Sequence, residues 1–172
     1  MPTSPERFLV TGAAGCIGAW AVRLLLDEGV PVVATDLSPD LRRFELISQG
    51  RAGQQPDFAA LDVTSARDVA ALVADRGITH VVHLAAQSFV GASWQTPAET
   101  LSTNIISQVN LLEGIRRFTI APRVLVIGSS EEYGLVCPDE LPIRETNPLR
   151  PLSPYAVSKV AQDMMGYQYF MS

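Results

Sequence analysis

A tyrosine and a lysine four residues apart, Tyr155 and Lys159, are the side chains of this sequence best suited to move a proton. On a helix this spacing places both residues on one face. The lysine ammonium would then lower the pKa of the phenol and make it a usable acid or base near neutral pH. Ser129 follows an apolar run earlier in the chain, where its hydroxyl can hold a sugar or keto oxygen. The three residues predict an oxidoreductase site.

A glycine-rich turn, with Gly12, Gly15 and Gly18 as its glycines and Cys16 and Ile17 between the last two, directly follows a short apolar run. A strand that turns sharply into a helix aims free backbone N–H groups and the positive end of the helix dipole at an anion. The turn therefore predicts a site for the pyrophosphate of a dinucleotide. Its spacing, G-x-x-G-x-x-G, differs from the commonest dinucleotide fingerprint, G-x-G-x-x-G.

Two carboxylates follow at the ends of the next two predicted strands. Asp36 stands where such a fingerprint expects an acceptor for the adenosine ribose hydroxyls, which favours NAD(H) because a 2′-phosphate would be repelled. Arg42 and Arg43 follow within reach of a phosphate, so NADP(H) stays open. Asp62 and Val63 are placed to meet the amino edge of adenine. The alternative is that each aspartate only caps the turn behind it.

Small and polar residues end the fourth predicted strand. Leu84, Ala85 and Ala86 would let a flat cofactor approach the backbone closely. His80 and His83, three apart on a strand, point to opposite faces and suit a structural role better than shared ligation of a metal. We therefore expect no metal site.

The fifth predicted strand exits into a segment rich in hydroxyls and carboxylates. Ser130 and Glu131 follow Ser129 directly, at the carboxyl end of the sheet where open α/β folds bind their ligands. We expect this to be the substrate end.

Short apolar runs alternate with helical patterns, which predicts an α/β fold of Rossmann type, a doubly wound parallel sheet with helices on both faces. The predicted strands are Phe8–Thr11, Pro31–Thr35, Asp57–Leu61, His80–Leu84 and Val124–Ile127. A helix over Ala66–Asp75 and one long helical pattern over Pro97–Phe118 stand between them. In the helix after the glycine turn, the expected inward stripe is Ile17, Ala21, Leu24 and Leu25.

The composition excludes several other classes of protein. The 172 residues predict one domain over 1–172, and the net charge of −5 offers no basic surface for nucleic acid. Cys16 and Cys137 are too few and too differently placed for a disulfide framework or a metal cluster, which favours a reducing cytoplasm. The chain has no uninterrupted apolar segment of membrane-spanning length.

These motifs resemble the extended short-chain dehydrogenase/reductase family, within its sugar-nucleotide epimerase/dehydratase group. Two further segments carry the same resemblance: His83-Leu84-Ala85-Ala86-Gln87-Ser88 and Arg150-Pro151-Leu152-Ser153-Pro154-Tyr155. The nearest resemblance is to its GDP-deoxyhexose enzymes. The resemblance implies that Ser129, Tyr155 and Lys159 are the catalytic trio. It also implies that Gly12, Gly15, Gly18, Asp36, Asp62, Val63 and Ala85 line the cofactor, and that Ser88 lies beside the sugar.

The resemblance leaves three activities open, all on a nucleotide sugar. Dehydratases of this group use a glutamate at the position of Glu131 to take the C5 proton, but usually carry a threonine at the position of Ser129. The Glu131-Glu132 pair is similar to the reductase pattern, so C4 reduction of a GDP-4-keto-6-deoxyhexose by NAD(P)H is favoured over GDP-mannose 4,6-dehydration. Epimerisation at C4 is the third possibility.

Two further expectations follow from the family. Its members run to roughly twice this length, with a substrate domain after the nucleotide domain. The sequence is thus expected to be the amino-terminal part of a larger enzyme, with a non-catalytic dinucleotide-binding module as the alternative. Related enzymes pair as homodimers through the helices that correspond to 97–118 and 154–170, although apolar residues there would also suit a core.

Overall fold

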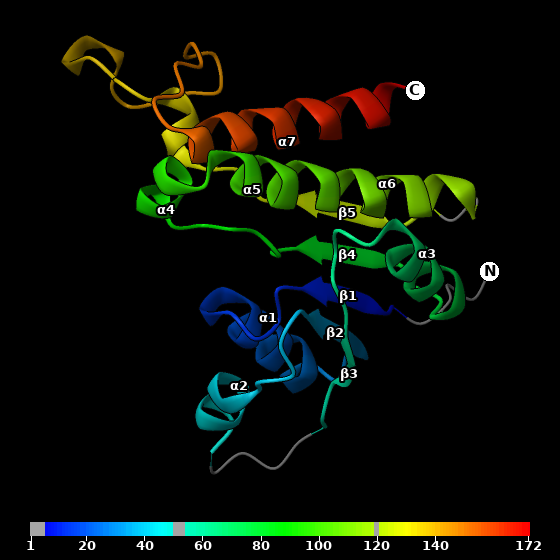
Figure 1. Ribbon diagram of the computed structural model, residues 1–172. Helices are drawn as coiled ribbons and strands as arrows, with labels where there is room; N and C mark the ends of the chain where they lie inside the picture. Colours follow the sequence, from blue (N-terminus) through cyan, green and yellow to red (C-terminus); the bar gives the residue numbers. More distant parts are fainter. Residues whose placement is uncertain (1–5, 50–53, 119–120) are drawn as a thin grey trace. The chain divides into compact units, whose positions relative to one another are not determined.

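The computed structural model describes residues 6–49, 54–118 and 121–172 (Figure 1). Its strands are β1 (Phe8–Thr11), β2 (Val32–Asp36), β3 (Asp57–Ala60), β4 (His80–His83) and β5 (Arg123–Val126). They form one sheet in the order β3-β2-β1-β4-β5, and the pairs β1–β2, β1–β4 and β2–β3 are parallel. The five predicted strands are confirmed, with ends that differ by one residue at most.

The helices are α1 (Cys16–Asp27), α2 (Arg42–Ile47), α3 (Ala66–Asp75), α4 (Val90–Gln95), α5 (Pro97–Leu101), α6 (Ser107–Arg117) and α7 (Pro154–Met171). A π-helix, η1 (Ser102–Ile106), and two 3₁₀ helices, η2 (Ser130–Tyr133) and η3 (Pro138–Glu140), complete the assignment. Helix α3 has the predicted bounds. None of the helices in the described ranges is long and apolar enough to cross a membrane.

The chain forms two compact units. The first comprises the described residues up to Ala85 together with those of Ser107–Leu125, and the second comprises Ala86–Ile106 and Val126–Ser172.

The first unit buries apolar side chains on both faces of the sheet. Val10 and Ala34 pack with Val22 and Leu26 of α1 and with Phe44 of α2. On the opposite face a second cluster joins the sheet to α3 and α6; its members are Leu9, Val33, Val69, Leu72, Val73, Ile78, Val81 and Leu111. Adjacent residues of one strand thus serve opposite faces. This two-sided burial confirms the doubly wound arrangement.

The stripe predicted for α1 is half correct: Ala21 and Leu25 are half-buried against the core of the first unit, but the other two residues are not. Ile17 and Leu24 are 69% and 57% exposed. The side chains buried on α1 belong instead to another set: Ala19, Val22, Arg23 and Leu26. The cause is the glycine turn, because a Cβ on Gly18 would lie 2.1 Å from the Gly12 carbonyl oxygen. This close approach sets which face of the helix is turned to the sheet.

The long helical pattern predicted over Pro97–Phe118 is interrupted. It consists of α5, the π-helix η1 and α6, and the described helix ends at Arg117. A π-helix accommodates an extra residue per turn and occurs mostly where function or packing requires it. Here it holds the fully buried Asn104.

In the second unit, α7 is the longest helix, with 18 residues. Its start is defined by Ser153, whose hydroxyl accepts a hydrogen bond from the Ala156 N–H at 3.0 Å, and by Pro154 in the first turn. This cap determines where the helix that carries Tyr155 and Lys159 begins.

Candidate active site

Two glycines of the first unit's turn are required by the fold itself. Gly12 has a φ of +68°, and a Cβ there would lie 2.8 Å from the Ala85 nitrogen. Gly18 lies against the Gly12 carbonyl, as described above. Both positions exclude larger residues because backbone atoms meet backbone atoms.

Gly15 differs from the other two. It is the N-cap of α1 with a φ of −69°, and a Cβ there would meet only the Gly12 carbonyl oxygen, at 3.1 Å. A side chain at this position would need the Gly12 carbonyl to move by a few tenths of an ångström. The bare surface that Gly15 leaves at the start of a 12-residue helix suits a close anion such as a pyrophosphate.

Thr11 joins the end of β1 to the small-residue segment behind β4. Its Oγ1 accepts hydrogen bonds from the Leu84 and Ala85 N–H groups, both at 3.1 Å, and lies 2.8 Å from Nδ1 of His83. The other ring nitrogen of His83 lies 3.2 Å from the Ser107 hydroxyl. In the sequence, the only signal of this role of Thr11 is its place at a strand end before the glycine turn.

His80 is stacked on Phe8, with ring centroids 4.4 Å apart. Both histidines thus have packing or hydrogen-bonding roles within the first unit. Over the described ranges, no group of three or more His, Cys, Asp and Glu residues could hold a metal ion.

Asp36 reaches the glycine turn. Its Oδ2 accepts a hydrogen bond from the Ala14 N–H at 2.9 Å, and its Oδ1 accepts one from the Ser38 N–H at 3.3 Å. The carboxylate is thereby held at the end of β2, beside the segment that precedes α1. It is half-buried, so one side stays open to solvent. This is compatible with the role in ribose binding that the sequence predicts.

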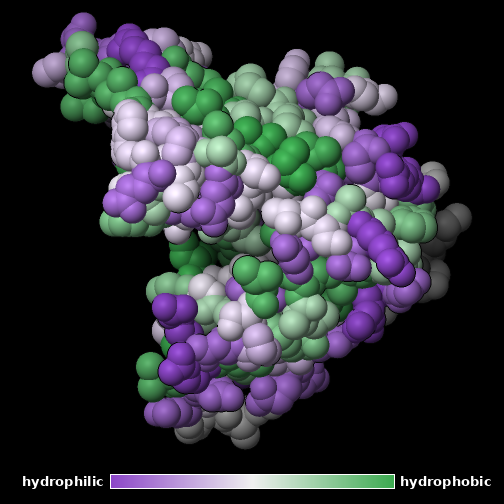
Figure 2. Space-filling model, viewed as in Figure 1, coloured by the Kyte–Doolittle hydropathy of each residue, from purple (hydrophilic) through white to green (hydrophobic). Residues whose placement is uncertain are grey.

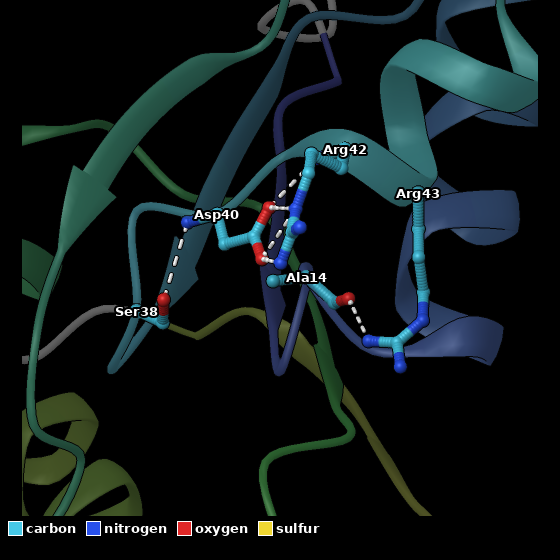
Figure 3. Close-up of polar contacts among 5 residues, drawn as sticks. All are labelled: Ala14, Ser38, Asp40, Arg42 and Arg43. Carbon is cyan, nitrogen blue, oxygen red and sulfur yellow. Dashed lines mark hydrogen bonds and ion pairs between the residues drawn. The ribbon is translucent and has the colours of Figure 1, made fainter.

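The two arginines that follow are held by the protein's own groups (Figure 3). Arg42 pairs with Asp40 through its Nε, at 2.8 and 2.9 Å from the two carboxylate oxygens, and this contact lowers the pKa of Asp40 to about 2. Arg43 donates a hydrogen bond to the Ala14 carbonyl at 3.0 Å. Ala14 is thus bonded on both its N–H and its carbonyl, and neither guanidinium is left unpaired beside Asp36.

Asp62 shapes its own turn. Its Oδ1 accepts hydrogen bonds from the Thr64 hydroxyl at 2.7 Å and the Thr64 N–H at 2.8 Å, which lower the pKa of the carboxyl. The cap of α3 is Ser65. Asn110, which the sequence analysis missed, donates to the Val63 and Thr64 carbonyls at 3.1 and 2.8 Å. The contact of Asp62 and Val63 with adenine stays a prediction.

In the second unit, Tyr155 and Lys159 lie on the buried face of α7. They are 9% and 5% exposed, and the Lys159 Nζ lies 5.9 Å from the centroid of the Tyr155 ring. The ammonium donates a hydrogen bond to the Ile127 carbonyl at 2.9 Å. Burial lowers the pKa of Lys159. The predicted same-face placement on one helix is confirmed.

Ser129 is the N-cap of η2. Its Oγ accepts a hydrogen bond from the Glu131 N–H at 3.2 Å, while its own N–H donates to Oε1 of Glu132 at 2.7 Å. Ser130 and Glu131 are exposed, as is Ser88 on the segment before α4, whereas Glu132 is only 6% exposed. The sequence predicts a chemical role only for Glu131, whereas the structure buries the adjacent Glu132.

Asn104 connects three segments of the second unit. Its Oδ1 accepts from the Gln87 N–H at 2.8 Å, and its Nδ2 donates to the Gln87 carbonyl at 3.1 Å and to the Ser158 hydroxyl at 2.8 Å. Its carbonyl accepts from Nε2 of Gln162 at 2.8 Å. The segment that leads to Ser88 is thus fixed to α7. An asparagine within a helical stretch was the only signal in the sequence.

The loop between η2 and α7 is fastened by Arg150. Its N–H donates to the Glu132 carbonyl at 3.0 Å, and its guanidinium pairs with Glu140, with Nη1 2.9 Å from Oε2. Gly134 has a φ of +58° and lies so close to the Arg150 carbonyl that a Cβ would be 1.8 Å from the oxygen. Cys137 and Cys16 are both exposed free thiols.

The sheet order, the two-sided burial and the glycine turn define a dinucleotide-binding fold of the Rossmann type. The chain matches the family model of GDP-mannose 4,6 dehydratase over residues 9–172. It therefore belongs to that family, and the resemblance to the sugar-nucleotide epimerase/dehydratase group is confirmed.

Individual relatives support this family assignment. The chain is 33% identical to the GDP-mannose 4,6-dehydratase sdnI of Sordaria araneosa over 160 residues, which cover 92% of this chain and 29% of that protein. It is 30% identical to the GDP-6-deoxy-D-mannose reductase of Pseudomonas aeruginosa, covering 95% of this chain and 47% of the relative. A crystal structure of Thermus thermophilus UDP-glucose 4-epimerase in complex with NAD matches with a TM-score of 0.82 and 33% identity, over 96% of this chain and 51% of that one. The chain thus spans about half or less of these proteins.

Proposed function

We propose that this chain is the cofactor-binding and proton-transferring part of a nucleotide-sugar reductase, which reduces the C4 keto group of a GDP-4-keto-6-deoxyhexose. The observation that carries the proposal is the pairing of Tyr155 with a buried lysine in the unit that also holds Ser129. A buried tyrosine–lysine pair with a neighbouring hydroxyl suits acid–base catalysis at an alcohol or ketone.

A bound nicotinamide dinucleotide would supply the hydride for this reduction. The chain's own residues would do the rest. Because the Ser129 oxygen already accepts from the Glu131 N–H, its hydrogen remains available to bond a keto oxygen. Tyr155 would donate its phenolic proton to that oxygen, and the Lys159 ammonium would favour the loss of this proton.

NAD(H) is the cofactor that the glycine turn supports best, with NADP(H) as the alternative. Asp36 places a negative charge at the end of β2, which disfavours a 2′-phosphate. Arg42 and Arg43 are bonded to Asp40 and Ala14, so binding a phosphate would require them to leave these partners. The NAD complex of the Thermus thermophilus relative is consistent with this preference. Calorimetry with NADH and NADPH on the native protein tests it, and tighter binding of NADPH would contradict it.

Reduction is favoured by Ser129, by the Glu131-Glu132 pair and by the similarity to the Pseudomonas aeruginosa reductase. The family model favours GDP-mannose 4,6-dehydration, for which the exposed Glu131 would serve as the C5 base. The epimerase relatives keep C4 epimerisation as a further alternative. A dinucleotide-binding module without turnover would bind NADH and act on none of these sugars.

The deciding experiment uses the full-length protein with three substrates: GDP-4-keto-6-deoxymannose with NADH, GDP-mannose, and UDP-glucose. We expect oxidation of NADH with the first substrate only. Conversion of GDP-mannose to its 4-keto-6-deoxy product would instead establish the dehydratase, and interconversion of UDP-glucose and UDP-galactose the epimerase.

We also propose that the protein forms a homodimer through α5, α6 and α7. Its proposed location is the reducing cytoplasm. Hydrophobic residues reach the surface of the molecule in several places (Figure 2), and on α7 Tyr167 and Phe170 are 63% and 85% exposed. An open groove of about 390 Å³, lined by Trp94, Leu101 and Val157 among others, adds to the apolar surface of α4, α5 and α7. The two free thiols are compatible with a reducing compartment. Sedimentation equilibrium of the full-length protein tests the dimer, and a monomer would contradict it.

A further inference from the structure

Lys159 is the only lysine among the 172 residues of the chain, and it is almost completely buried. Its single hydrogen-bond partner among the described residues is the Ile127 carbonyl, at 2.9 Å. A neutral carbonyl only partly compensates for the water that an ammonium loses on burial. A negative charge nearby would stabilise the protonated state that catalysis would need.

Glu132 is a buried carboxylate in the same unit. Its Oε1 accepts from the Ser129 N–H at 2.7 Å and lies where a Cβ on Gly128 would be only 2.9 Å away. The carboxylate is thus packed against the backbone between Ile127, which binds Lys159, and Ser129. An apolar side chain would fill this position without the cost of burying a charge.

We propose that Glu132 is the positioning residue of the Ser129, Tyr155 and Lys159 cluster, because it holds Ser129 by its backbone amide and supplies a negative charge that stabilises the Lys159 ammonium. The catalytic consequence rests on the function proposed above; the electrostatic claim does not.

Burial and the neighbouring charges shift the pKa values of Lys159 and Glu132. Burial lowers the pKa of Lys159, and the charge of Glu132 opposes that shift. Burial raises the pKa of Glu132, the negative charge of Asp163 on α7 raises it further, and the Ser129 N–H and Lys159 lower it. The other titratable groups of these elements are Glu131 and Tyr133 on η2 and Tyr155, Tyr167 and Tyr169 on α7.

The same chain contains a matched control. Glu140 caps the start of η3 as Glu132 caps the start of η2, by accepting the N–H of the residue before the helix; for Glu140 this is the Cys137 N–H, at 2.7 Å. Its carboxylate pairs with Arg150, and Lys159 is not among the groups that shift its pKa. If Glu132 were only a helix cap, replacing either glutamate by glutamine would have the same kind of effect.

Because the chain has one lysine, ¹³Cε-lysine labelling produces a single side-chain signal, and its titration by NMR measures the pKa of Lys159 directly. Glu132→Gln keeps the size of the side chain and an oxygen for the Ser129 N–H but removes the charge. We expect it to lower the pKa of Lys159 by at least about half a unit, a roughly threefold change in the proton dissociation constant. Glu140→Gln is expected to leave the pKa unchanged. A Glu132→Gln value within about 0.2 of the native one would overturn the proposal.

If Glu132→Gln does not fold, Glu132→Asp is used for the same titration, because it retains the charge on a shorter side chain. We expect a pKa of Lys159 within about 0.3 of the native value even if the protein is less stable. A fall as large as about half a unit in this charge-retaining variant would contradict the proposal.

The kinetic arm uses the full-length enzyme. Glu132→Gln should lower kcat by about tenfold with little change in KM, and it should move the alkaline limb of the kcat profile to lower pH. Glu140→Gln should leave this profile unmoved. Absence of turnover in the native enzyme with every nucleotide sugar would refute the proposed function and leave the NMR result standing. If the native enzyme is active but the pKa of Lys159 is unchanged in Glu132→Gln, this inference is refuted and the proposed function stands.

Discussion

Replacement of Asn104 by alanine is the sharpest test of how the second unit is held together. The variant removes three hydrogen bonds from a fully buried side chain, two to the backbone of Gln87 and one to the Ser158 hydroxyl. A hydrogen bond contributes about 1 kcal/mol net, and buried groups that lose their partners cost more. We therefore expect Asn104→Ala to reduce the free energy of unfolding by about 3 kcal/mol.

Asn147 provides the comparison. It also makes two hydrogen bonds to backbone, from the Arg144 N–H at 3.0 Å and to the Glu140 carbonyl at 3.1 Å, but it lies on a largely exposed loop. Water can replace these bonds, so Asn147→Ala should cost about 1 kcal/mol or less.

Urea unfolding of both variants and of the native chain measures the difference, and an unchanged m-value would show that the compactness of the unfolded state is the same. Equal losses in the two variants, or a loss below about 1 kcal/mol for Asn104→Ala, would refute the argument that this buried network fastens the Gln87 segment to α7.

Three further predictions concern the cofactor, the proton donor and the loop. Gly15→Val should abolish calorimetric binding of NADH in a chain that still unfolds cooperatively, although its Cβ would press on the Gly12 carbonyl oxygen; unchanged affinity would exclude the turn as the pyrophosphate site. Tyr155→Phe in the full-length enzyme should lower kcat by at least about a hundredfold with unchanged dinucleotide affinity, and near-native turnover would exclude Tyr155 as the acid. The Arg150 guanidinium holds the pKa of Glu140 at about 2 instead of 4.5, so this pair stabilises the fold above pH 4.5 and ceases to do so as the pH falls to about 2. Glu140→Gln should thus show a smaller loss of stability over this pH range than the native chain, and an equal loss in acid titrations would contradict the assignment.

The local features of this protein are visible in its sequence because they depend on near neighbours. Each strand is a short apolar run bounded by turn residues, and α3 has the predicted bounds because Ser65 caps its start and Gly77, with a φ of +59°, follows its end. The glycine turn and the spacing of Tyr155 and Lys159 are equally local. These patterns were sufficient to predict the fold class, the family and the candidate catalytic side chains.

Other features depended on contacts between residues far apart in the chain. Periodicity alone placed Ile17 and Leu24 on the inward face of α1, whereas the packing of Gly18 on Gly12 turns both side chains to the surface. A continuous helical pattern also concealed the π-helix that carries Asn104, whose partners Gln87 and Ser158 lie 17 and 54 residues away.

The two adjacent glutamates show the limit most clearly. Glu131 and Glu132 are chemically identical in the sequence, and the local pattern offers no reason to bury either one. The tertiary structure exposes the first and encloses the second between the Ser129 backbone and the helix that carries Lys159. Which carboxylate loses its water, and so has its pKa raised, was decided by the packing of η2 against α7, because desolvation depends on every group around a charge and not on its neighbours in the chain.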